Sequence, residues 1–92
     1  MVMLWIEDFD WDPRNVGHIA RHEVQPHEVE DLFCNEPLVR RGGEDKYIAY
    51  GQTNAGRYVV VVFAYRGGGL ARVITARNMD DKERRLYLRD RR

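Results

Sequence analysis

An unbroken apolar run, Val59-Val60-Val61-Val62-Phe63, constrains the fold more than any other feature of the sequence. β-Branched residues favour extended strands, and a strand with one solvent-exposed face alternates apolar and polar residues. This run does not alternate. We therefore expect a strand over residues 57–65 whose centre is covered on both faces, one by helices and the other by a partner or another element.

The run lies among short extended segments that turn signals separate. Asn54-Ala55-Gly56 and Gly67-Gly68-Gly69 are rich in residues that tolerate positive φ, as tight turns require, and residues 41–45 are expected to form a loop. Short connections of this kind predict an antiparallel meander after a short N-terminal strand or extended arm. The expected strands are residues 4–9, 38–40, 46–52, 57–65 and 70–76.

Two helices are expected before the meander. Asp12 followed by Pro13 is typical of a helix start, because the carboxylate caps free N–H groups and proline fits the first helical position. Apolar residues at helical spacing then extend to about His22. Pro26 begins a second helical pattern, which Pro37 ends.

A third helix is expected at the end of the chain, because Asp80 and Glu83 have the spacing of a capping box that opens a helix reaching about Asp90. A chain of 92 residues can bury one core, and it has no room for a second domain or a deep cofactor cleft. We expect one domain, residues 1–92. Its fold class is α+β, with two N-terminal helices and one C-terminal helix packed on a small antiparallel sheet.

Charge is divided unevenly along the chain, although the 15 Lys and Arg balance the 15 Asp and Glu. Residues 1–46 hold five basic and eleven acidic residues, a net charge of −6, and residues 47–92 hold ten basic and four acidic ones, a net charge of +6. This asymmetry indicates either a surface for a polyanion or ion pairs between the two halves. The sequence leaves both open.

The single cysteine, Cys34, excludes a disulfide framework and a cysteine metal cluster. We expect it to be a buried apolar residue at a helix end. The apolar run at residues 1–6 is too short for a signal peptide or a membrane span. We therefore expect a cytoplasmic protein without membrane contact.

His18 and His22 are four residues apart and share a helix face. The pair lacks the HExxH pattern and a third ligand, so we expect neither a metal nor another cofactor. Two interpretations stay open: a solvated or hydrogen-bonded pair, and a histidine that transfers a proton or contacts a phosphate. His27 is expected to be a surface residue.

Arg72 and Arg77 lie on the last expected strand, and their odd spacing predicts opposite faces. By the same rule Arg77 shares a face with Val73 and Thr75, at the junction into the third helix. An arginine there can clamp a phosphate or form an ion pair with the acidic half of the chain. The sequence does not decide between phosphate binding and an ion pair.

Basic side chains dominate the third helix. Arg84 lies beside the i, i+4 pair of Glu83 and Tyr87, and Tyr87 can donate a proton, stack on a base or pack on the sheet. Phosphate affinity accumulates over contacts, so the basic face is more informative than any one member. That face comprises Lys82, Arg85, Arg89 and Arg92.

Several motifs follow one another over about residues 9–89: Phe9-Asp10-Trp11-Asp12-Pro13, His18-Ile19-Ala20-Arg21-His22-Glu23-Val24, Pro26-His27-Glu28-Val29-Glu30, Gly56-Arg57-Tyr58-Val59-Val60-Val61, Arg72-Val73-Ile74-Thr75-Ala76-Arg77, and Glu83-Arg84-Arg85 with Tyr87. In this order they resemble the BrnT-like toxins. The resemblance implies a RelE/ParE-like fold and the toxin of a type II toxin–antitoxin pair. It also implies a metal-independent ribonuclease that inhibits translation and is neutralised by a BrnA-like antitoxin. The toxin would contact operator DNA only through this antitoxin.

The resemblance implies that Arg77, Arg84 and Tyr87 lie near the active surface, with His22 after the first helix. From residue type and matched position we hypothesise that His22 helps the 2′-OH attack the phosphate, Arg77 and Arg84 stabilise the developing charge, and Tyr87 protonates the leaving oxygen. Two positions depart from the family pattern: Glu23 stands where glycine commonly closes the first helix, and Asn15 near a frequent lysine. The expected RNA-binding residues are Arg57, Arg72, Lys82, Arg85 and Arg89.

Two other functions fit the same residues. One is a non-catalytic binding protein or corepressor, and the other is a ParE-like inhibitor of topoisomerase. A homodimer through an uncovered sheet face is a further expectation that the sequence leaves open.

Overall fold

The computed structural model describes residues 4–91, and this part of the chain has the predicted α+β class. Residues 1–3 of the N-terminal apolar run and Arg92 of the basic face lie outside the described residues. The elements in chain order are β1 (Asp8–Phe9), α1 (Pro13–Ala20), α2 (Pro26–Cys34), β2 (Leu38–Gly43), β3 (Lys46–Gln52), β4 (Tyr58–Tyr65), β5 (Leu70–Asn78) and α3 (Asp81–Asp90).

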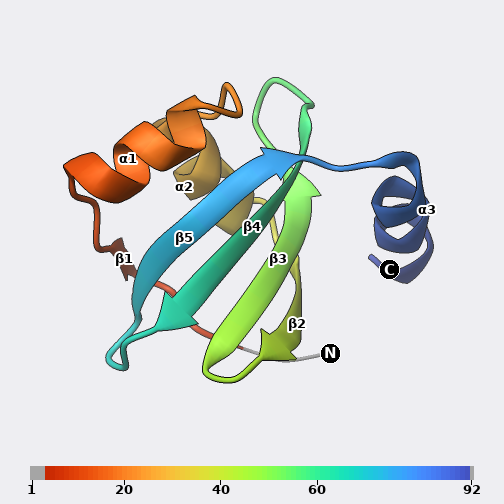
Figure 1. Ribbon diagram of the computed structural model, residues 1–92. Coiled ribbons are helices and arrows are strands. Elements are labelled where there is room, and N and C mark those ends of the chain that lie inside the picture. Colours follow the sequence, from red (N-terminus) through yellow and green to blue (C-terminus); the bar gives the residue numbers. More distant parts are fainter. Residues whose placement is uncertain (1–3, 92) are drawn as a thin grey trace.

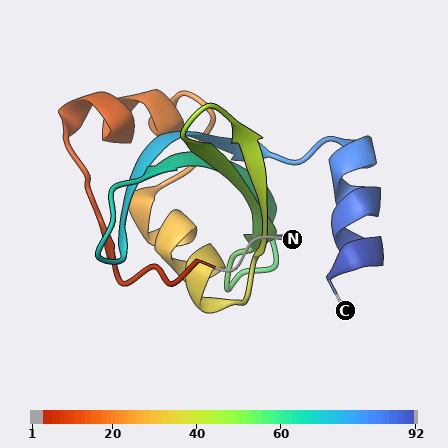
Figure 2. The ribbon, with the colours of Figure 1, turned by 90° about the horizontal axis from the view of Figure 1, so that it is seen from below.

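The strands form one curved sheet in the order β1-β5-β4-β3-β2 (Figures 1 and 2). Strands β2 to β5 are the predicted antiparallel meander. The sheet is mostly antiparallel, and it departs from the prediction at one edge, where β1 pairs parallel to β5. This strand has two residues where six were expected, because Asp8 pairs with Leu70, the first residue of β5, and the residues before Asp8 lie beyond the start of that strand. Further along β5, the side-chain amide of Asn15 donates to the carbonyl of Val73 at 3.0 Å.

The loop predicted at residues 41–45 is wrong in extent. Strand β2 continues to Gly43 and β3 begins at Lys46, which leaves a tight turn of Glu44 and Asp45. The turn is possible because Asp45 adopts a left-handed backbone with φ 55°. A bulge between Arg41 and Gly43 adjusts the register of the hairpin.

The helices lie on both sides of the sheet: α1 and α2 on one side and α3 on the other (Figure 1). The valine run is covered on both faces, as predicted, and the second cover is α3. Val59, Val61 and Phe63 belong to the main core, whereas Val60 packs with Tyr87 of α3 in a second cluster. The main core consists of Ile19, Val24, Val29, Leu32, Val39, Ala49, Val59, Val61, Phe63, Ala71, Val73 and Ala76.

The prediction that Arg72 and Arg77 point to opposite faces is wrong. A register shift opposite Val62 and Phe63 of β4 inserts one extra residue, Ile74, into β5. Arg72 pairs with Ala64 and Arg77 with Val60, and two β4 residues four apart share a face. Both arginines therefore point away from the main core. The same shift separates Arg77 from Val73, which lies in that core.

The prediction that Cys34 is buried is also wrong, because the side chain is exposed. Helix α2 buries Val29 and Leu32 in the core. Cys34 is two residues after Leu32, and successive helical residues are about 100° apart around the axis, so Cys34 faces away from the core. Cys34 lines an open groove with Trp5 at the surface. No helix within residues 4–91 is long and apolar enough to cross a membrane.

Candidate functional site

The junction between β5 and α3 gathers most of the predicted catalytic residues. The Arg77 guanidinium forms a two-point ion pair with Glu83, in which Nη1 lies 2.8 Å from Oε1 and Nη2 lies 2.9 Å from Oε2. Glu83 Oε1 also accepts from the backbone N–H of Asp80 at 2.9 Å, and the Asp80 carboxylate accepts from the N–H of Glu83. The predicted capping box is confirmed, and it places a carboxylate against Arg77.

Arg84 reaches the same region through a cation–π contact. Its guanidinium carbon lies 4.2 Å from the centre of the Tyr58 ring. Arg77 pairs across the sheet with Val60, and Tyr58 is two residues from Val60 on the same strand face. Arg77 and Tyr58 are thus diagonal neighbours about 7–8 Å apart. Two arginines from different elements are therefore both neighbours of Tyr58 at one end of the sheet.

Tyr87 belongs to this region through its ring. The side chain is 4% exposed and packs with Leu38, Tyr50 and Val60. Its ring meets that of Tyr58 edge to face, with 6.1 Å between the centroids. Of the interpretations left open by the sequence, packing on the sheet is the one that the contacts show.

The charges at the junction reinforce one another. Hydrogen bonds from Arg77 lower the pKa of the Glu83 carboxyl, and Glu83 raises the pKa of Arg77. Burial raises the pKa of the Tyr50 phenol, and the negative charge of Glu83 adds to that shift. At neutral pH the junction thus contains an ionised Arg77–Glu83 pair beside a protonated phenol.

The structure does not bring His22 to this junction. It lies exposed in the turn after α1, and α1 lies on the side of the sheet opposite α3 (Figure 1). Its ring meets that of His18 edge to face at 5.7 Å, and His18 Nε2 lies 3.1 Å from Thr75 Oγ1. Among residues 4–91, the hydrogen bonds connect His22 to the end of β5 through Arg57, which donates to the His22 carbonyl and to the side chain of Asn78.

Arg57, a predicted RNA-binding residue, ties the α1–α2 turn to the sheet. Besides its bonds to His22 and Asn78, it donates to the carbonyl of Glu23 and pairs with Glu28 of α2 at 3.2 Å. Glu23 has φ 61°, so the position where the family commonly has glycine is left-handed here with a glutamate in it. Arg57 therefore holds a strained turn in place.

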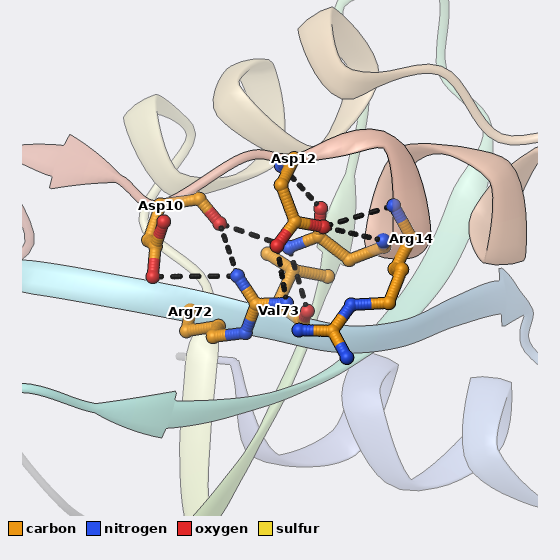
Figure 3. A network of polar contacts seen from close by, with 6 residues as sticks. Asp10, Asp12, Arg14, Arg72 and Val73 are labelled. Carbon is orange, nitrogen blue, oxygen red and sulfur yellow. Dashed lines mark hydrogen bonds and ion pairs between the residues drawn. The ribbon is translucent and has the colours of Figure 1, made fainter.

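Arg72, a second predicted RNA-binding residue, is held by the N-terminal segment (Figure 3). Its Nη2 lies 2.9 Å from Asp12 and its Nη1 3.3 Å from Asp10. Backbone N–H groups of α1, chiefly that of Asn15, and Arg72 itself lower the pKa of the Asp12 carboxyl. Asp12 also raises the pKa of Arg72. This arginine therefore helps to fasten the α1 N-terminus to β5.

The other three predicted RNA-binding residues lie on α3 and are exposed. Arg89 is 72% exposed and pairs with its neighbour Asp90 at 2.8 Å. No ion pair in the described part of the chain involves Lys82 or Arg85. These two cations are available to a ligand.

Both interpretations of the uneven charge find support. Four of the six ion pairs within residues 4–91 join the acidic half of the chain to the basic half: Arg40–Asp90, Arg57–Glu28, Arg72–Asp10 and Arg72–Asp12. The remaining basic residues of β5 and α3 gather on the side of the sheet that α3 covers. The acidic half thus neutralises some arginines, and a basic surface remains.

Sequence reasoning missed two residues of the junction. Tyr58 was passed over, although its position two residues before Val60 places it on the α3 side of the sheet. The sequence predicts Glu83 as a capping residue and as the i, i+4 partner of Tyr87, but not its contact with Arg77, which joins residues from two elements. Within residues 4–91, no group of three or more His, Cys, Asp or Glu side chains is placed to hold a metal ion.

The fold and the arginine-centred junction define a small α+β protein with cations presented beside a C-terminal helix. Residues 11–83 match the family model described as "Ribonuclease toxin, BrnT, of type II toxin-antitoxin system". The match spans well over half of the chain, and the chain belongs to this family of toxins. The resemblance seen in the sequence motifs is thus confirmed.

A solved structure shows the same fold. The crystal structure of the Brucella abortus ribonuclease toxin BrnT, determined at 1.1 Å, matches with a TM-score of 0.66 and 23% sequence identity. The match covers 80% of this chain and 97% of that chain. Comparison with curated protein sequences finds no match.

Proposed function

We propose that this protein is a metal-independent endoribonuclease that cleaves RNA, inhibits translation and is neutralised by a BrnA-like antitoxin. Its membership of the BrnT family supports a ribonuclease toxin. The RelE/ParE-like relationship, the cytoplasmic location and contact with operator DNA through the antitoxin alone belong to the same proposal.

The observation that carries the proposal is the pair of arginines at the β5–α3 junction. Cleavage without a metal needs cationic groups that stabilise the charge developing on the phosphate. Arg77, 46% exposed, and Arg84, stacked on Tyr58, are supplied by different elements and converge at one end of the sheet. They would hold the scissile phosphate while Lys82 and Arg85 bind neighbouring phosphates along α3.

Proton transfer is proposed for the same two residues as in the sequence analysis. Tyr87 is the proposed acid for the leaving oxygen, and its buried ring packs beside Tyr58. The proposed role of His22 as the base requires RNA to extend from the junction to the α1–α2 turn, because its side chain has no described contact with Arg77 or Arg84. A single-stranded substrate several nucleotides long can extend from the junction to that turn.

The direct test is cleavage of single-stranded RNA by purified protein in EDTA. We expect cleavage to persist in the chelator and Arg77→Ala to lower its rate about 100-fold or more. Growth arrest on expression should be relieved by the same change. Intact RNA with the wild-type protein, together with normal growth, would contradict the proposal.

Two variants test the proton-transfer residues separately. Tyr87→Phe keeps the ring in its packing site and removes only the hydroxyl, so a lower rate with unchanged stability supports the acid role. His22→Gln removes the titrating group in an exposed turn. We expect each variant to lose about 10²-fold in rate if its residue transfers a proton.

One observation favours the non-catalytic alternative, in which the protein acts as a binding protein, corepressor or topoisomerase inhibitor. Carboxylates hold the guanidinium groups of Arg57, Arg72 and Arg77. If growth inhibition survives Arg77→Ala while antitoxin binding is intact, this alternative is correct. Induction of the DNA-damage response would then indicate topoisomerase as the target.

A further inference from the structure

The hydrogen bonds of Arg77 use only part of its guanidinium. Nη1 donates to Glu83 Oε1 at 2.8 Å and to the carbonyl of Asn78 at 3.1 Å, and Nη2 donates to Glu83 Oε2 at 2.9 Å. A guanidinium has five N–H donors. Three are therefore occupied within the described chain, and Nε–H and the second N–H of Nη2 are left.

These two remaining donors lie on one edge of the guanidinium, because Nη2 is on the same side of the Cζ–Nε bond as the Nε hydrogen. The edge presents two parallel N–H groups, the arrangement that binds two oxygens of one phosphate. Glu83 occupies the neighbouring edge between Nη1 and Nη2. The carboxylate thus leaves a bidentate edge of Arg77 available.

We propose that Glu83 is a positioning residue, which fixes the Arg77 guanidinium so that its Nε/Nη2 edge receives two non-bridging oxygens of the scissile phosphodiester. This inference rests on the proposed ribonuclease function. It adds a residue that acts through Arg77 and does not touch the reacting atoms. The same acidic residue thereby serves as helix cap and as the guide for the phosphate-binding arginine.

The local geometry supports this role from two directions. The capping box anchors Glu83, because its Oε1 accepts from the N–H of Asp80, and the carbonyl of Asn78 holds Nη1 of Arg77. The guanidinium plane is thus held at two points before substrate arrives. A pre-oriented arginine loses less conformational entropy on binding than a free one.

The same geometry argues against Glu83 as a general base. Its two oxygens already accept three hydrogen bonds, and the Arg77 interaction lowers the pKa of the carboxyl. A general base works best with a pKa near the working pH. The function of the carboxylate is therefore the orientation of Arg77.

A double-mutant cycle with Glu83→Gln and Arg77→Lys tests the inference. Glutamine at this position still completes a capping box, but it replaces two charged contacts with one neutral acceptor. We expect Glu83→Gln to lower kcat/KM for single-stranded RNA about tenfold in the wild-type background and less than about twofold with Arg77→Lys. Equal effects in both backgrounds would overturn the inference, as would an unchanged rate.

Asp80→Asn is the matched control, because asparagine caps a helix as well as aspartate does and removes a negative charge from the same turn. We expect kcat/KM within about twofold of the wild type. If Asp80→Asn lowers activity as much as Glu83→Gln does, the effect reflects the helix end or its charge, and the inference fails. A shift of the acidic limb of the pH–rate profile by Glu83→Gln would indicate a general base instead.

A measurement that does not require cleavage separates this inference from the proposed function. A short single-stranded oligodeoxynucleotide lacks the 2′-OH and cannot be cleaved, so its binding can be followed by NMR at the Nε–H of Arg77. We expect a discrete resonance that shifts on titration in the wild type and loses the shift in Glu83→Gln. If the wild type cleaves no RNA but shows this difference, only the enzymatic function fails. The same resonance in both proteins would overturn the role of Glu83.

Discussion

The arginines of this protein form two groups with different surroundings. Arg57 and Arg72 bind the turn after α1 and the segment before it, and their side chains are 25% and 18% exposed. Arg84 belongs to α3 and Arg77 lies beside it. Arg77 is 46% exposed and keeps two N–H donors for a ligand. The difference teaches that an arginine already paired with a carboxylate, as Arg77 is with Glu83, stays available to RNA only where its side chain remains exposed.

Loss of Arg57 should have the largest effect on stability. Arg57→Ala removes the hydrogen bonds that Arg57 donates to Glu28, to Asn78 and to two carbonyls of the α1–α2 turn. We expect the free energy of unfolding to fall by about 2 kcal/mol in urea denaturation, because hydrogen bonds to charged groups contribute about 1.5–3 kcal/mol.

Arg66→Ala is the matched control for this prediction, since Arg66 is exposed in the β4–β5 connection. Its stability should stay within about 0.5 kcal/mol of the wild type. The separation of the arginines into two groups would be wrong if Arg57→Ala kept its stability and lost RNA affinity.

Relief of strain at the turn that Arg57 holds should have the next largest effect. Glu23 is left-handed with φ 61°, and this conformation costs an L-residue about 1–2 kcal/mol. Glu23→Gly should raise the free energy of unfolding by about 1 kcal/mol, with unchanged RNA affinity. Lower stability would show that the exposed side chain contributes contacts of its own.

The salt dependence of RNA binding should sharpen the comparison. Each phosphate of a single strand that the protein neutralises releases a counterion, and this makes the slope of log K against log salt steeper by about 0.7. We expect Lys82→Ala and Arg85→Ala each to reduce the slope by about that amount in fluorescence anisotropy, and Arg72→Ala to leave it unchanged. A reduced slope for Arg72→Ala would place that arginine on the RNA.

The smallest expected effect is on the pH dependence of the free energy of unfolding. Arg77 lowers the pKa of Glu83 in the folded protein, so this group stabilises the fold above the unfolded pKa of about 4.3 and loses the contribution as pH falls through the lower folded value. The stability difference between wild type and Glu83→Gln should be about 0.5 kcal/mol at pH 7, because Arg77 is partly exposed, and should shrink below pH 4. Thermal unfolding at several pH values measures it.

Much of the fold could be predicted because local signals agreed with the tertiary structure. The capping residues Asp12 and Asp80 begin helices as expected. The unbroken valine run predicted two covered faces, and α3 supplies the second cover. Local chemistry acts over a few residues, so its signals survive in the sequence alone.

The failures share a different cause. The bulge at Ile74 places Arg72 and Arg77 on the same face of the sheet, where the sequence predicted opposite faces. No residue type near Ile74 indicates a bulge. The exposure of Cys34 depended on which stripe of α2 meets the sheet. Both outcomes depend on how one element packs or pairs with another, and residues far apart in the sequence determine that.

The candidate site shows the same division. Sequence alone determined the capping box, the basic composition of α3 and the motifs that indicated the family, because these depend on residue types at short spacings. Only the tertiary structure decided that Glu83 meets Arg77, that Arg84 lies over Tyr58 and that Arg57 and Arg72 are already paired. The physical reason is that an arginine binds through the direction of its N–H groups, and long-range packing sets that direction.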